Sequence, residues 1–349
     1  MRNPKINLLA ILLSAFVWVL CSCNADPKPA GNAIEAVKVE AKDKRPIPKF
    51  VPDSAFQYVK KQVDFGIRLP GTPTHKACKE WLSAKLKSFG ATVIEQDFEA
   101  QVYTGEKLPA TNIIGQYNPG VQPRIVLSAH WDSRHIAEED PDPIKKKQPI
   151  LGADDGASGV GVLLELARII GENGIDIGVD IIFFDAEDHG SNLKKTNPTD
   201  VEILQNRKTW CLGSQYWAAN PHTKPYRAKY GVLLDMVGAK NARFPLEGYS
   251  KYYAPEIQKK IWRLAKSMGF GNQFVNVEGG AITDDHLFVN QIAKIPMVDI
   301  IHLTATQGKT FGPHWHTHTD DLSVIDKRTL KAVGRVVTAM VYRENNGEF

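Results

Sequence analysis

The stretch Val179-Asp180-Ile181-Ile182-Phe183-Phe184 is a nearly continuous apolar run, and Asp185-Ala186-Glu187-Asp188-His189 follows it directly. A short run of this kind, with almost no alternation of polar residues, is typical of a central strand that is covered on both faces. The polar residues after it then fall where the strand ends. This stretch therefore predicts a buried strand that presents three acids and a histidine at its carboxyl end.

Acids and histidines follow three other apolar runs of the chain in the same way. In an open α/β sheet, the carboxyl ends of the parallel strands form the crevice that binds ligands. We therefore expect these polar side chains to converge at one edge of the sheet. The three cases are His130-Trp131-Asp132 after Ile125-Val126-Leu127, Asp235 after Val232-Leu233-Leu234, and His302 after Val298-Asp299-Ile300-Ile301.

Stretches with helical spacing of apolar residues alternate with these strand-like runs. Such alternation predicts an α/β fold, namely a three-layer sandwich whose central sheet is mixed but mostly parallel, with helices on both faces. The predicted helices are 54–65, 74–89, 157–170, 211–219, 256–268 and 327–343, and the predicted strands are 92–100, 112–116, 124–130, 179–184, 230–235, a short one near Asn276, and 296–302.

The N-terminus has the composition of a targeting signal. Arg2 and Lys5 precede an uncharged apolar run over residues 8–20, which is too short to span a bilayer comfortably. The following Leu20-Cys21-Ser22-Cys23 resembles a bacterial lipobox. We predict a signal peptide over 1–22, cleavage before Cys23 and lipidation of that cysteine; an ordinary secretory peptide cut nearby is the alternative.

The remaining chain divides into a tether and one domain. Residues 23–49 are rich in Pro, Ala and Lys and predict a flexible tether, and 50–349 predict a single globular domain. We expect an exported bacterial lipoprotein that faces the periplasm, acts as a monomer and touches the membrane only through its lipid. Cys78 and Cys211 remain after processing, and the sequence leaves open whether they pair.

Charge and motif content exclude several other functions. The formal net charge of the 349 residues is +4, and removal of Arg2 and Lys5 with the signal leaves about +2. No basic stripe interleaves with aromatic residues, so we expect no nucleic-acid partner. There is no G-x-S-x-G motif for a serine nucleophile, and Cys211 has no evident partner base.

A glycine-rich turn, Gly152-Ala153-Asp154-Asp155-Gly156-Ala157-Ser158-Gly159, opens the helix predicted at 157–170. Such a turn can cradle phosphate, but here two carboxylates inside it would repel an anion and suit a cation instead. The alternative is that Asp155 only caps the helix. The other acid and histidine clusters favour the cation.

Near the C-terminus, His314, His316 and His318 fall within five residues of a loop that contains Gly312 and Pro313. An imidazole from this loop can bind a metal, and the spacing does not decide which one does. A mixture of carboxylate and imidazole ligands without thiolates suits a catalytic zinc ion. The adjacent pair Glu187 and Asp188 fits a division of labour in which one carboxylate binds the metal and the other moves protons.

At this point the chain resembles the zinc-dependent family that unites M28-type aminopeptidases with animal-type glutaminyl cyclases. The resemblance runs from about Phe56 to the C-terminus, and the motifs that carry it are specific in combination. They are Arg68-Leu69-Pro70-Gly71-Thr72, Ala129-His130-Trp131-Asp132-Ser133, Gly152-Ala153-Asp154-Asp155-Gly156-Ala157, Phe183-Phe184-Asp185-Ala186-Glu187-Asp188, Gly213-Ser214, Leu233-Leu234-Asp235-Met236-Val237-Gly238-Ala239 and Trp315-His316-Thr317.

Several details look more like the cyclases than the peptidases, among them Trp315 before His316 and the segment Asp284-Asp285-His286. The implied reaction is the conversion of an N-terminal glutamine of peptides or proteins to pyroglutamate with release of ammonia. The resemblance implies the following roles: one zinc ion held by Asp155, Asp188 and His316, general acid/base catalysis by Glu187, hydrogen bonding to developing charge by Asp284, pocket walls from Trp315 and Phe311, and support from Asp235, His302 and His130.

Two departures keep alternatives open. Asp188 stands where many relatives have Glu, which is longer by one methylene. His130 and Asp235 are both present, and in the peptidases their equivalents hold a second zinc ion, so a two-zinc aminopeptidase is the alternative. We favour His130 as a supporting residue, and His316 over His318 as the ligand. A binding domain on the same fold without catalysis is a further alternative, which the complete set of acids and histidines disfavours.

Overall fold

A computed structural model describes residues 44–192, 195–304 and 310–349. Its centre is a six-stranded sheet in the order β1-β2-β4-β3-β5-β8. The four strands β4, β3, β5 and β8 run parallel, whereas β1 and β2 pair antiparallel at one edge. The strands are β1 (Thr92–Gln101), β2 (Lys107–Tyr117), β3 (Arg124–His130), β4 (Gly178–Phe184), β5 (Tyr230–Asp235) and β8 (Met297–Ile301), and a separate two-stranded sheet pairs β6 (Phe244–Leu246) with β7 (Phe274–Glu278).

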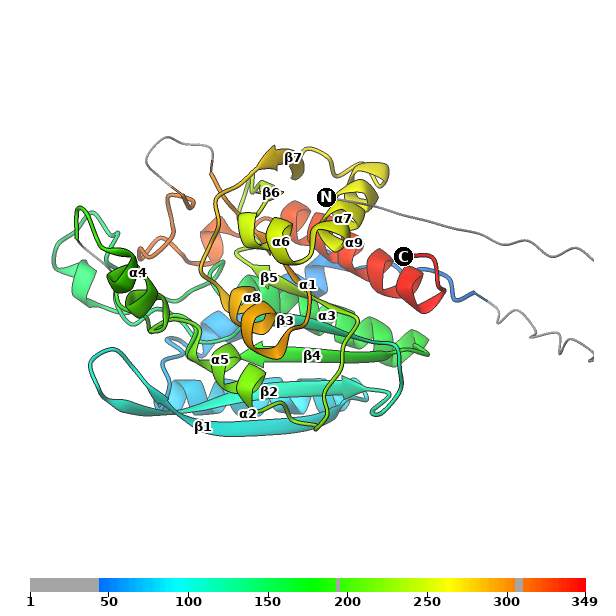
Figure 1. The fold of residues 1–349 in the computed structure, drawn as a ribbon, viewed down its shortest axis with the longest axis horizontal. Helices are drawn as coiled ribbons and strands as arrows, with labels where there is room; N and C mark the ends of the chain where they lie inside the picture. Colours follow the sequence, from blue (N-terminus) through cyan, green and yellow to red (C-terminus); the bar gives the residue numbers. More distant parts are fainter. Residues whose placement is uncertain (1–43, 193–194, 305–309) are drawn as a thin grey trace, which may run out of the picture. The chain divides into compact units, whose positions relative to one another are not determined.

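Helices cover both faces of the sheet (Figure 1), which confirms the predicted three-layer α/β sandwich. Each predicted helix and strand is present, with bounds that differ by a few residues except at β2, which begins five residues earlier than predicted. The helices are α1 (Pro52–Asp64), α2 (Pro73–Ser88), α3 (Ala157–Asn173), α4 (Asp200–Arg207), α5 (Leu212–Ala219), α6 (Gly248–Tyr253), α7 (Pro255–Ser267), α8 (Asp285–Phe288) and α9 (Lys327–Asn345).

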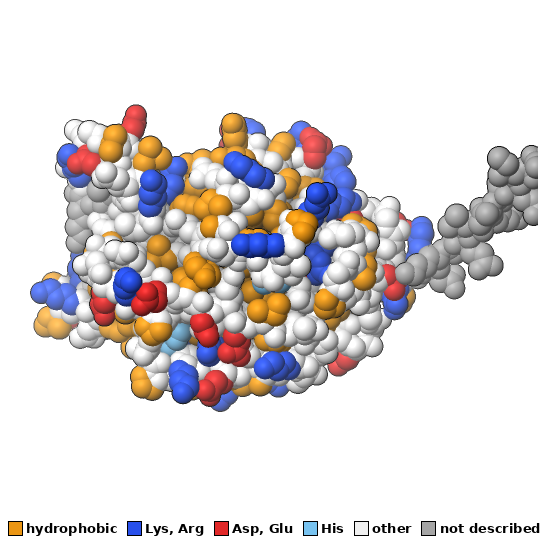
Figure 2. All heavy atoms as spheres, turned by 60° about the horizontal axis from the view of Figure 1, so that its bottom comes forward, with side chains coloured by type: hydrophobic (Ala, Val, Ile, Leu, Met, Phe, Trp, Pro, Cys, Tyr) orange, Lys and Arg blue, Asp and Glu red, His pale blue; other side chains and the backbone are white. Residues whose placement is uncertain are grey.

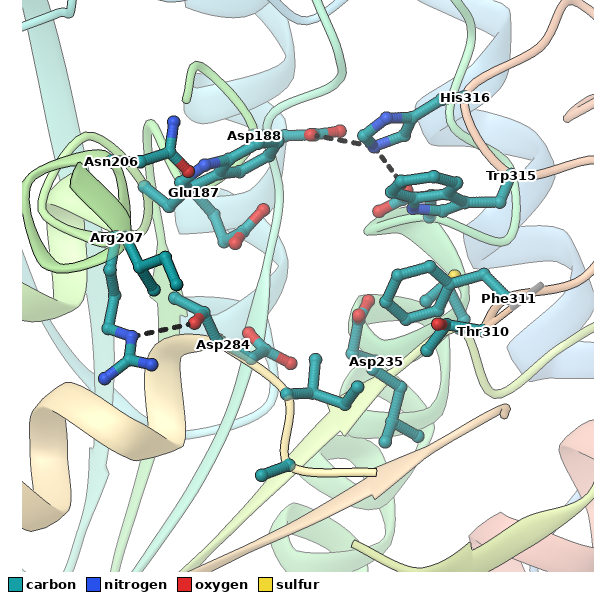
Figure 3. Close-up of a pocket in the computed structure, with 18 residues that line it drawn as sticks. Glu187, Asp188, Asn206, Arg207, Asp235, Asp284, Thr310, Phe311, Trp315 and His316 are labelled. Carbon is teal, nitrogen blue, oxygen red and sulfur yellow. Dashed lines mark hydrogen bonds and ion pairs between the residues drawn. The ribbon is translucent and has the colours of Figure 1, made fainter. Parts of the chain in front are cut away.

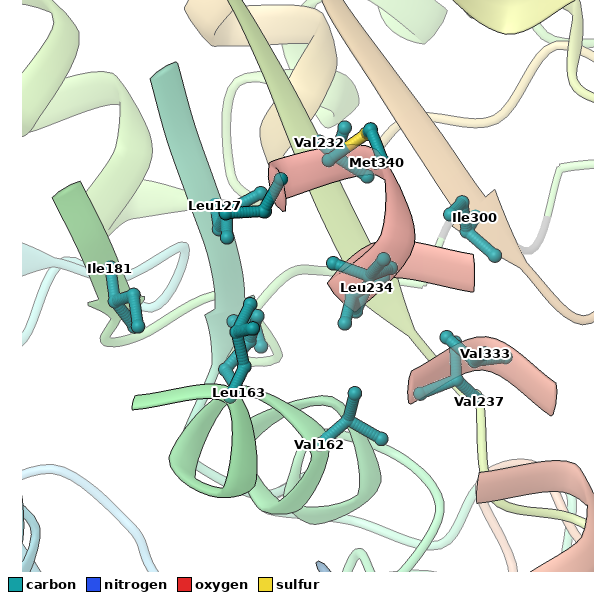
Figure 4. Close-up of a cluster of buried hydrophobic side chains, with 14 of the residues drawn as sticks. Leu127, Val162, Leu163, Ile181, Val232, Leu234, Val237, Ile300, Val333 and Met340 are labelled. Atoms are coloured by element: carbon teal, nitrogen blue, oxygen red, sulfur yellow. The ribbon is translucent and has the colours of Figure 1, made fainter. Parts of the chain in front are cut away.

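Alternating residues of the central strands enter two different hydrophobic clusters, because successive side chains of a strand point to opposite faces. On β4, Ile181 packs in the larger cluster with α1, α2, α3 and α9, whereas Ile182 packs on the other face with Trp217 of α5. Figure 4 shows the larger cluster between α3, α9 and the sheet. Burial on both faces is the reason that the run 179–184 lacks polar alternation.

The folded domain includes residues before position 50, where the sequence predicted that it begins. The backbone N–H of Arg45 donates to Asn346 Oδ1 at 3.0 Å, and its guanidinium pairs with Asp176 at 2.9 Å. Residues 44–49, which we assigned to the tether, therefore lie along the domain next to the end of α9. The predicted signal peptide, Cys23 and the rest of the tether lie outside the described residues.

The surface carries charges of both signs. On the face in Figure 2, basic and acidic side chains both occur, with apolar side chains between them. Among the described helices, none is both long and apolar enough to cross a bilayer.

Close packing of α3 on β5 depends on Gly159. A Cβ atom at this position would lie 2.2 Å from the backbone oxygen of Leu234, which cannot move aside as a side-chain tip could. We expect Gly159→Ala to lower the free energy of unfolding by roughly 1–3 kcal/mol, although alanine is the better helix former. Urea unfolding measures this, with Gly271→Ala as control, because a Cβ there meets only Lys266 at 3.7 Å. Equal stability of the two variants would contradict the packing of α3.

Candidate active site

A pocket of about 320 Å³ opens at the carboxyl ends of the parallel strands, where the sequence placed the ligand crevice. Its floor is acidic and buried, and Phe311 and Trp315 form one wall with ring centroids 4.5 Å apart (Figure 3). The opposite wall comes from the end of α4 and from residues 281–283. The acids on the floor are Asp155, Glu187, Asp188, Asp235 and Asp284.

Asp132 positions the two neighbouring acids after β4. Its two carboxylate oxygens accept the backbone N–H groups of Glu187 and Asp188, each at 3.1 Å. Ala186 has a φ of 53°, in the left-handed region that non-glycine residues rarely adopt. The tight turn after the strand therefore aims both carboxylates into the pocket.

Asp155 reaches the pocket from the turn before α3. Asp320 holds this turn by accepting the backbone N–H groups of Asp154 and Asp155, at 2.8 and 3.1 Å. Gly156 has a φ of 87°, and a Cβ atom there would lie 2.8 Å from His130 Cε1. The glycine is thus required by both the turn and the close approach of His130.

The imidazole of His316 is oriented by a contact to its Nδ1 atom, which points away from the pocket. Its Nδ1 lies 3.0 Å from Glu138 Oε1, and Glu138 is itself paired with the buried Arg134. The ring of Trp315 stacks on the imidazole at a centroid distance of 3.7 Å. A carboxylate on one ring nitrogen is the usual way in which a protein fixes a histidine whose other nitrogen binds a metal.

Asp155, Asp188 and His316 form a group that fits a divalent cation. All three are buried, and one ligand atom from each lies within 4.8 Å of the others. His316 Nε2 is 3.2 Å from Asp188 Oδ1, yet within the described chain neither carboxylate oxygen of Asp188 has a hydrogen-bond partner. Burial, and then the neighbouring Asp155, raise the pKa of Asp188 to about 6. A bound cation would give these buried oxygens the partner that they lack.

His130, Asp155 and Asp235 form a second group of three donors on the other side of Asp155. His130 Nε2 lies 2.9 Å from Asp155 Oδ1 and 3.3 Å from Asp235 Oδ1, whereas His316 faces Asp155 Oδ2. Although burial opposes it, these carboxylates and Asp132 raise the pKa of His130 well above its usual value. Asp155 therefore stands between two candidate cation positions.

Glu187 lies beside the first group without belonging to it. The thiol of Cys211 donates to Glu187 Oε1 at 3.0 Å, and Asp284 approaches the same carboxylate. Burial, and then the charges of Asp188 and Asp284, raise the pKa of Glu187, while His130 opposes the shift. A raised carboxyl pKa suits a group that must both accept and return a proton near neutral pH.

Buried polar side chains surround Asp284 on the side away from the pocket. Asp299 of β8, His286 and Asp284 each have a polar side-chain atom within 4.8 Å of the other two. His286 Nε2 is also 3.0 Å from Glu247 Oε2. Burial, and then Asp284, raise the pKa of Asp299, so this second carboxyl favours its neutral form beside the first. The arrangement holds Asp284 in the pocket, on the side opposite Trp315.

The family model for peptidase family M28 matches residues 112–341, which include every residue of the two donor groups. The chain belongs to peptidase family M28. Its M28 domain is 48% identical to a glutaminyl cyclase from Bacteroides thetaiotaomicron whose crystal structure contains N-acetylhistamine; the match covers 85% of this chain and 99% of that one, with a TM-score of 0.81.

Two other relatives of the M28 domain bear different names. A Zn-dependent exopeptidase structure from Parabacteroides distasonis has the same values, 48% identity, 85% and 99% coverage and a TM-score of 0.81. A glutaminyl-peptide cyclotransferase-like protein of Bos taurus is 24% identical over 97% of this chain and 89% of its own length. Homologues of the M28 domain are thus named both as cyclases, which are acyltransferases, and as exopeptidases.

Most of the site residues predicted from the sequence meet in the pocket of the M28 domain; His130 lies directly beneath it, against Asp155 and Asp235. His302 lies elsewhere: its ring is 6.3 Å from that of His314, beside Asp154, and it is not among the pocket-lining residues. His318 is also outside the pocket and pairs with Asp140 at 2.9 Å. Cys78 and Cys211 are both buried and free.

Sequence reasoning missed several residues that shape the pocket. Asp299 gave a usable signal, because it is an acid inside the apolar run 298–301. Glu138 and Arg134 gave none, since their pairing with His316 depends on how the loop after β3 folds back. Arg207, at the end of an unpredicted helix, also lines the pocket.

Proposed function

We propose that this protein is a glutaminyl-peptide cyclotransferase, which converts the N-terminal glutamine of peptides or proteins to pyroglutamate and releases ammonia. The observation that carries the proposal is the position of Glu187. Its carboxylate is free of the Asp155–Asp188–His316 group, faces the same pocket and has a raised pKa. The pocket is walled by Phe311 and Trp315, which suits a single short side chain.

The substrate would enter with its glutamine side chain between the aromatic wall and the acidic floor. The α-amine then lies near Glu187 and Asp284, the two floor carboxylates that belong neither to the Asp155–Asp188–His316 group nor to the His130–Asp155–Asp235 group. Aromatic rings and buried acids together exclude water and fix the amine close to the γ-carbon, which favours intramolecular attack.

Glu187 would move the proton in both halves of the reaction. It first takes a proton from the α-amine, whose nitrogen then forms a bond to the γ-carbonyl carbon. It next gives that proton to the γ-nitrogen, and the carbon–nitrogen bond of the side-chain amide breaks to release ammonia. Asp284 can accept a hydrogen bond from the amine as positive charge develops on it. A zinc ion held by Asp155, Asp188 and His316 would polarise the γ-carbonyl and stabilise its oxyanion.

A two-zinc aminopeptidase is the second candidate, and a specific observation favours it. His130 and Asp235 face Asp155 from the side opposite His316, so the chain has donors for two cations that share one aspartate. We favour the cyclase because Trp315 precedes His316 and the segment Asp284-Asp285-His286 is present, as in the cyclases that the sequence resembles, and because relatives at 46–48% identity are named glutaminyl cyclases. The cyclase proposal includes one zinc ion per chain, whereas the aminopeptidase would hold two.

We further propose that the protein is an exported lipoprotein anchored through Cys23 and facing the periplasm. The basic start, the uncharged run over 8–20 and the lipobox-like Leu20-Cys21-Ser22-Cys23 support this. The domain would act as a monomer on its tether, on peptides that begin with glutamine.

Incubation of the purified zinc-loaded protein with two peptides separates the candidates. The peptides have the same sequence except that one begins with glutamine and the other with leucine. We expect ammonia release from the glutamine peptide and no reaction of the leucine peptide, because leucine has no γ-amide. Release of free leucine would instead identify an aminopeptidase.

A further inference from the structure

One side chain of the pocket has a charge opposite to the acids around it. Arg207, the last residue of α4, is the single Lys or Arg among the described residues that line the pocket. The floor acids are at most 8% exposed, whereas Arg207 is half-buried and Ile203, one turn before it, is 37% exposed. Arg207 therefore lies toward the mouth of the pocket, on the wall opposite Trp315 (Figure 3).

The guanidinium of Arg207 is oriented by neighbouring side chains but has no carboxylate partner among the described residues. Its Nε donates to Thr283 Oγ1 at 3.1 Å, and its central carbon lies 5.5 Å from the ring centroid of Tyr249. Within the described residues, no carboxylate lies within 4.0 Å of it. The four N–H donors on its two terminal nitrogens thus remain available in a fixed orientation.

Several other arginines of this domain that are largely removed from solvent are paired with a carboxylate. Arg124 contacts Asp180, Arg134 contacts Glu138, and Arg168 contacts Glu165, each through a carboxylate within 2.7 Å. Arg68 instead donates to three backbone carbonyls. A half-buried guanidinium that a hydroxyl and a ring orient, and that has no carboxylate partner, is suited to bind an anion from a ligand, because its planar donors match a carboxylate.

We propose that Arg207 forms a carboxylate-binding subsite at the mouth of the pocket, which takes an anionic group located shortly after the N-terminal glutamine of the substrate. This inference rests on the proposed cyclase function and specifies its substrate class. Two carboxylates have the required chemistry: an acidic side chain at the second residue, and the C-terminal carboxylate of a very short peptide.

The position of the subsite fits a peptide that runs outward from the floor. Thr283, which orients Arg207, is the residue before Asp284, and consecutive Cα atoms lie about 3.8 Å apart. Because Arg207 is hydrogen-bonded to the residue next to Asp284, we place the anionic group on the first or second residue after the glutamine, each of which spans about 3.3–3.6 Å when extended. The floor acids would receive the substrate's amine and the mouth its carboxylate, so the two ends of a short zwitterionic peptide meet opposite charges.

Four peptides test the subsite and distinguish the two sources of the carboxylate. The side-chain arm compares the amidated tripeptides Gln-Glu-Phe and Gln-Gln-Phe, and the C-terminal arm compares Gln-Phe with a free carboxylate and Gln-Phe amide. We expect kcat/KM of the wild type to favour the anionic member of at least one arm by roughly tenfold, between the effect of an exposed ion pair and that of a buried charged hydrogen bond. Added salt should reduce the preference.

In Arg207→Met, which keeps apolar bulk and removes the charge, that preference should fall to within about twofold. Arg207→Lys should retain part of it, and Lys208→Met, a change at the exposed neighbouring residue, should retain all of it. A wild type without preference in either arm, a preference that survives in Arg207→Met, or an equal loss on all four peptides would overturn the subsite. Failure of the wild type to cyclise any of the four peptides would instead refute the proposed function itself.

Discussion

Replacement of Glu187 by glutamine is expected to lower kcat for cyclisation by about 10³-fold while the bound zinc stays unchanged. General acid–base catalysis by one positioned group contributes about 10²–10⁴-fold, and Glu187 is the candidate for both proton transfers. The amide is close in shape to the carboxylate and can still accept from the Cys211 thiol that lies 3.0 Å from Oε1. Steady-state rates on a glutamine peptide and zinc content by atomic emission measure the two quantities.

Glu99→Gln is the matched control, because this glutamate lies on β1 with an exposed side chain that pairs with Lys107. It should keep both rate and zinc. If Glu187→Gln lost zinc in parallel with activity, Glu187 would be a ligand rather than the proton carrier. If it retained normal turnover, the assignment of the general acid/base would be wrong.

Replacement of His316 by alanine is expected to remove zinc, and with it the activity. Loss of a partner behind a ligand typically weakens metal binding about 10–100-fold, so loss of the ligand itself should exceed this. His316 is buried, 3.2 Å from Asp188 and 3.7 Å from Asp155, and its rear nitrogen is fixed by Glu138. Competition with a chelator of known affinity gives the change in dissociation constant, and circular dichroism reports whether the variant is folded.

His318→Ala provides the control from the same loop. His318 is paired with Asp140 and its side chain is 26% exposed, so this variant should bind zinc as the wild type does. The reverse pattern, zinc lost in His318→Ala and kept in His316→Ala, would move the ligand to the other histidine.

The sequence predicts the layers of this fold well because a buried strand or helix has a recognisable local pattern of apolar residues. The run 179–184 is apolar since both faces of β4 are covered, and the acids after it fall at the strand end. Helix α4 has no buried residue, so it has no apolar face by which it could be predicted. Its available signal is the capping box that begins at Thr199, with Glu202 three residues later.

The site was predictable in its residue types but less so in its pairings. The choice between His316 and His318 depends on a left-handed residue, since His316 has a φ of 53° and its loop folds onto Glu138 and Asp140. His302 follows a buried strand like the other site residues, yet the structure directs it toward His314 and not into the pocket. The roles of Asp132 behind the two acids and of Thr283 beside Arg207 come from contacts between distant segments, which spacing does not encode.

Mass spectrometry of the glutamine-initiated peptide after exposure to the zinc-loaded protein tests the central claim most directly. We expect a peptide of unchanged length that has lost the mass of one ammonia, because a buried carboxylate beside a single cation, in a pocket that fits one side chain, favours cyclisation. A peptide shortened by its first residue, with free glutamine in solution, would contradict the cyclase and favour two-metal hydrolysis.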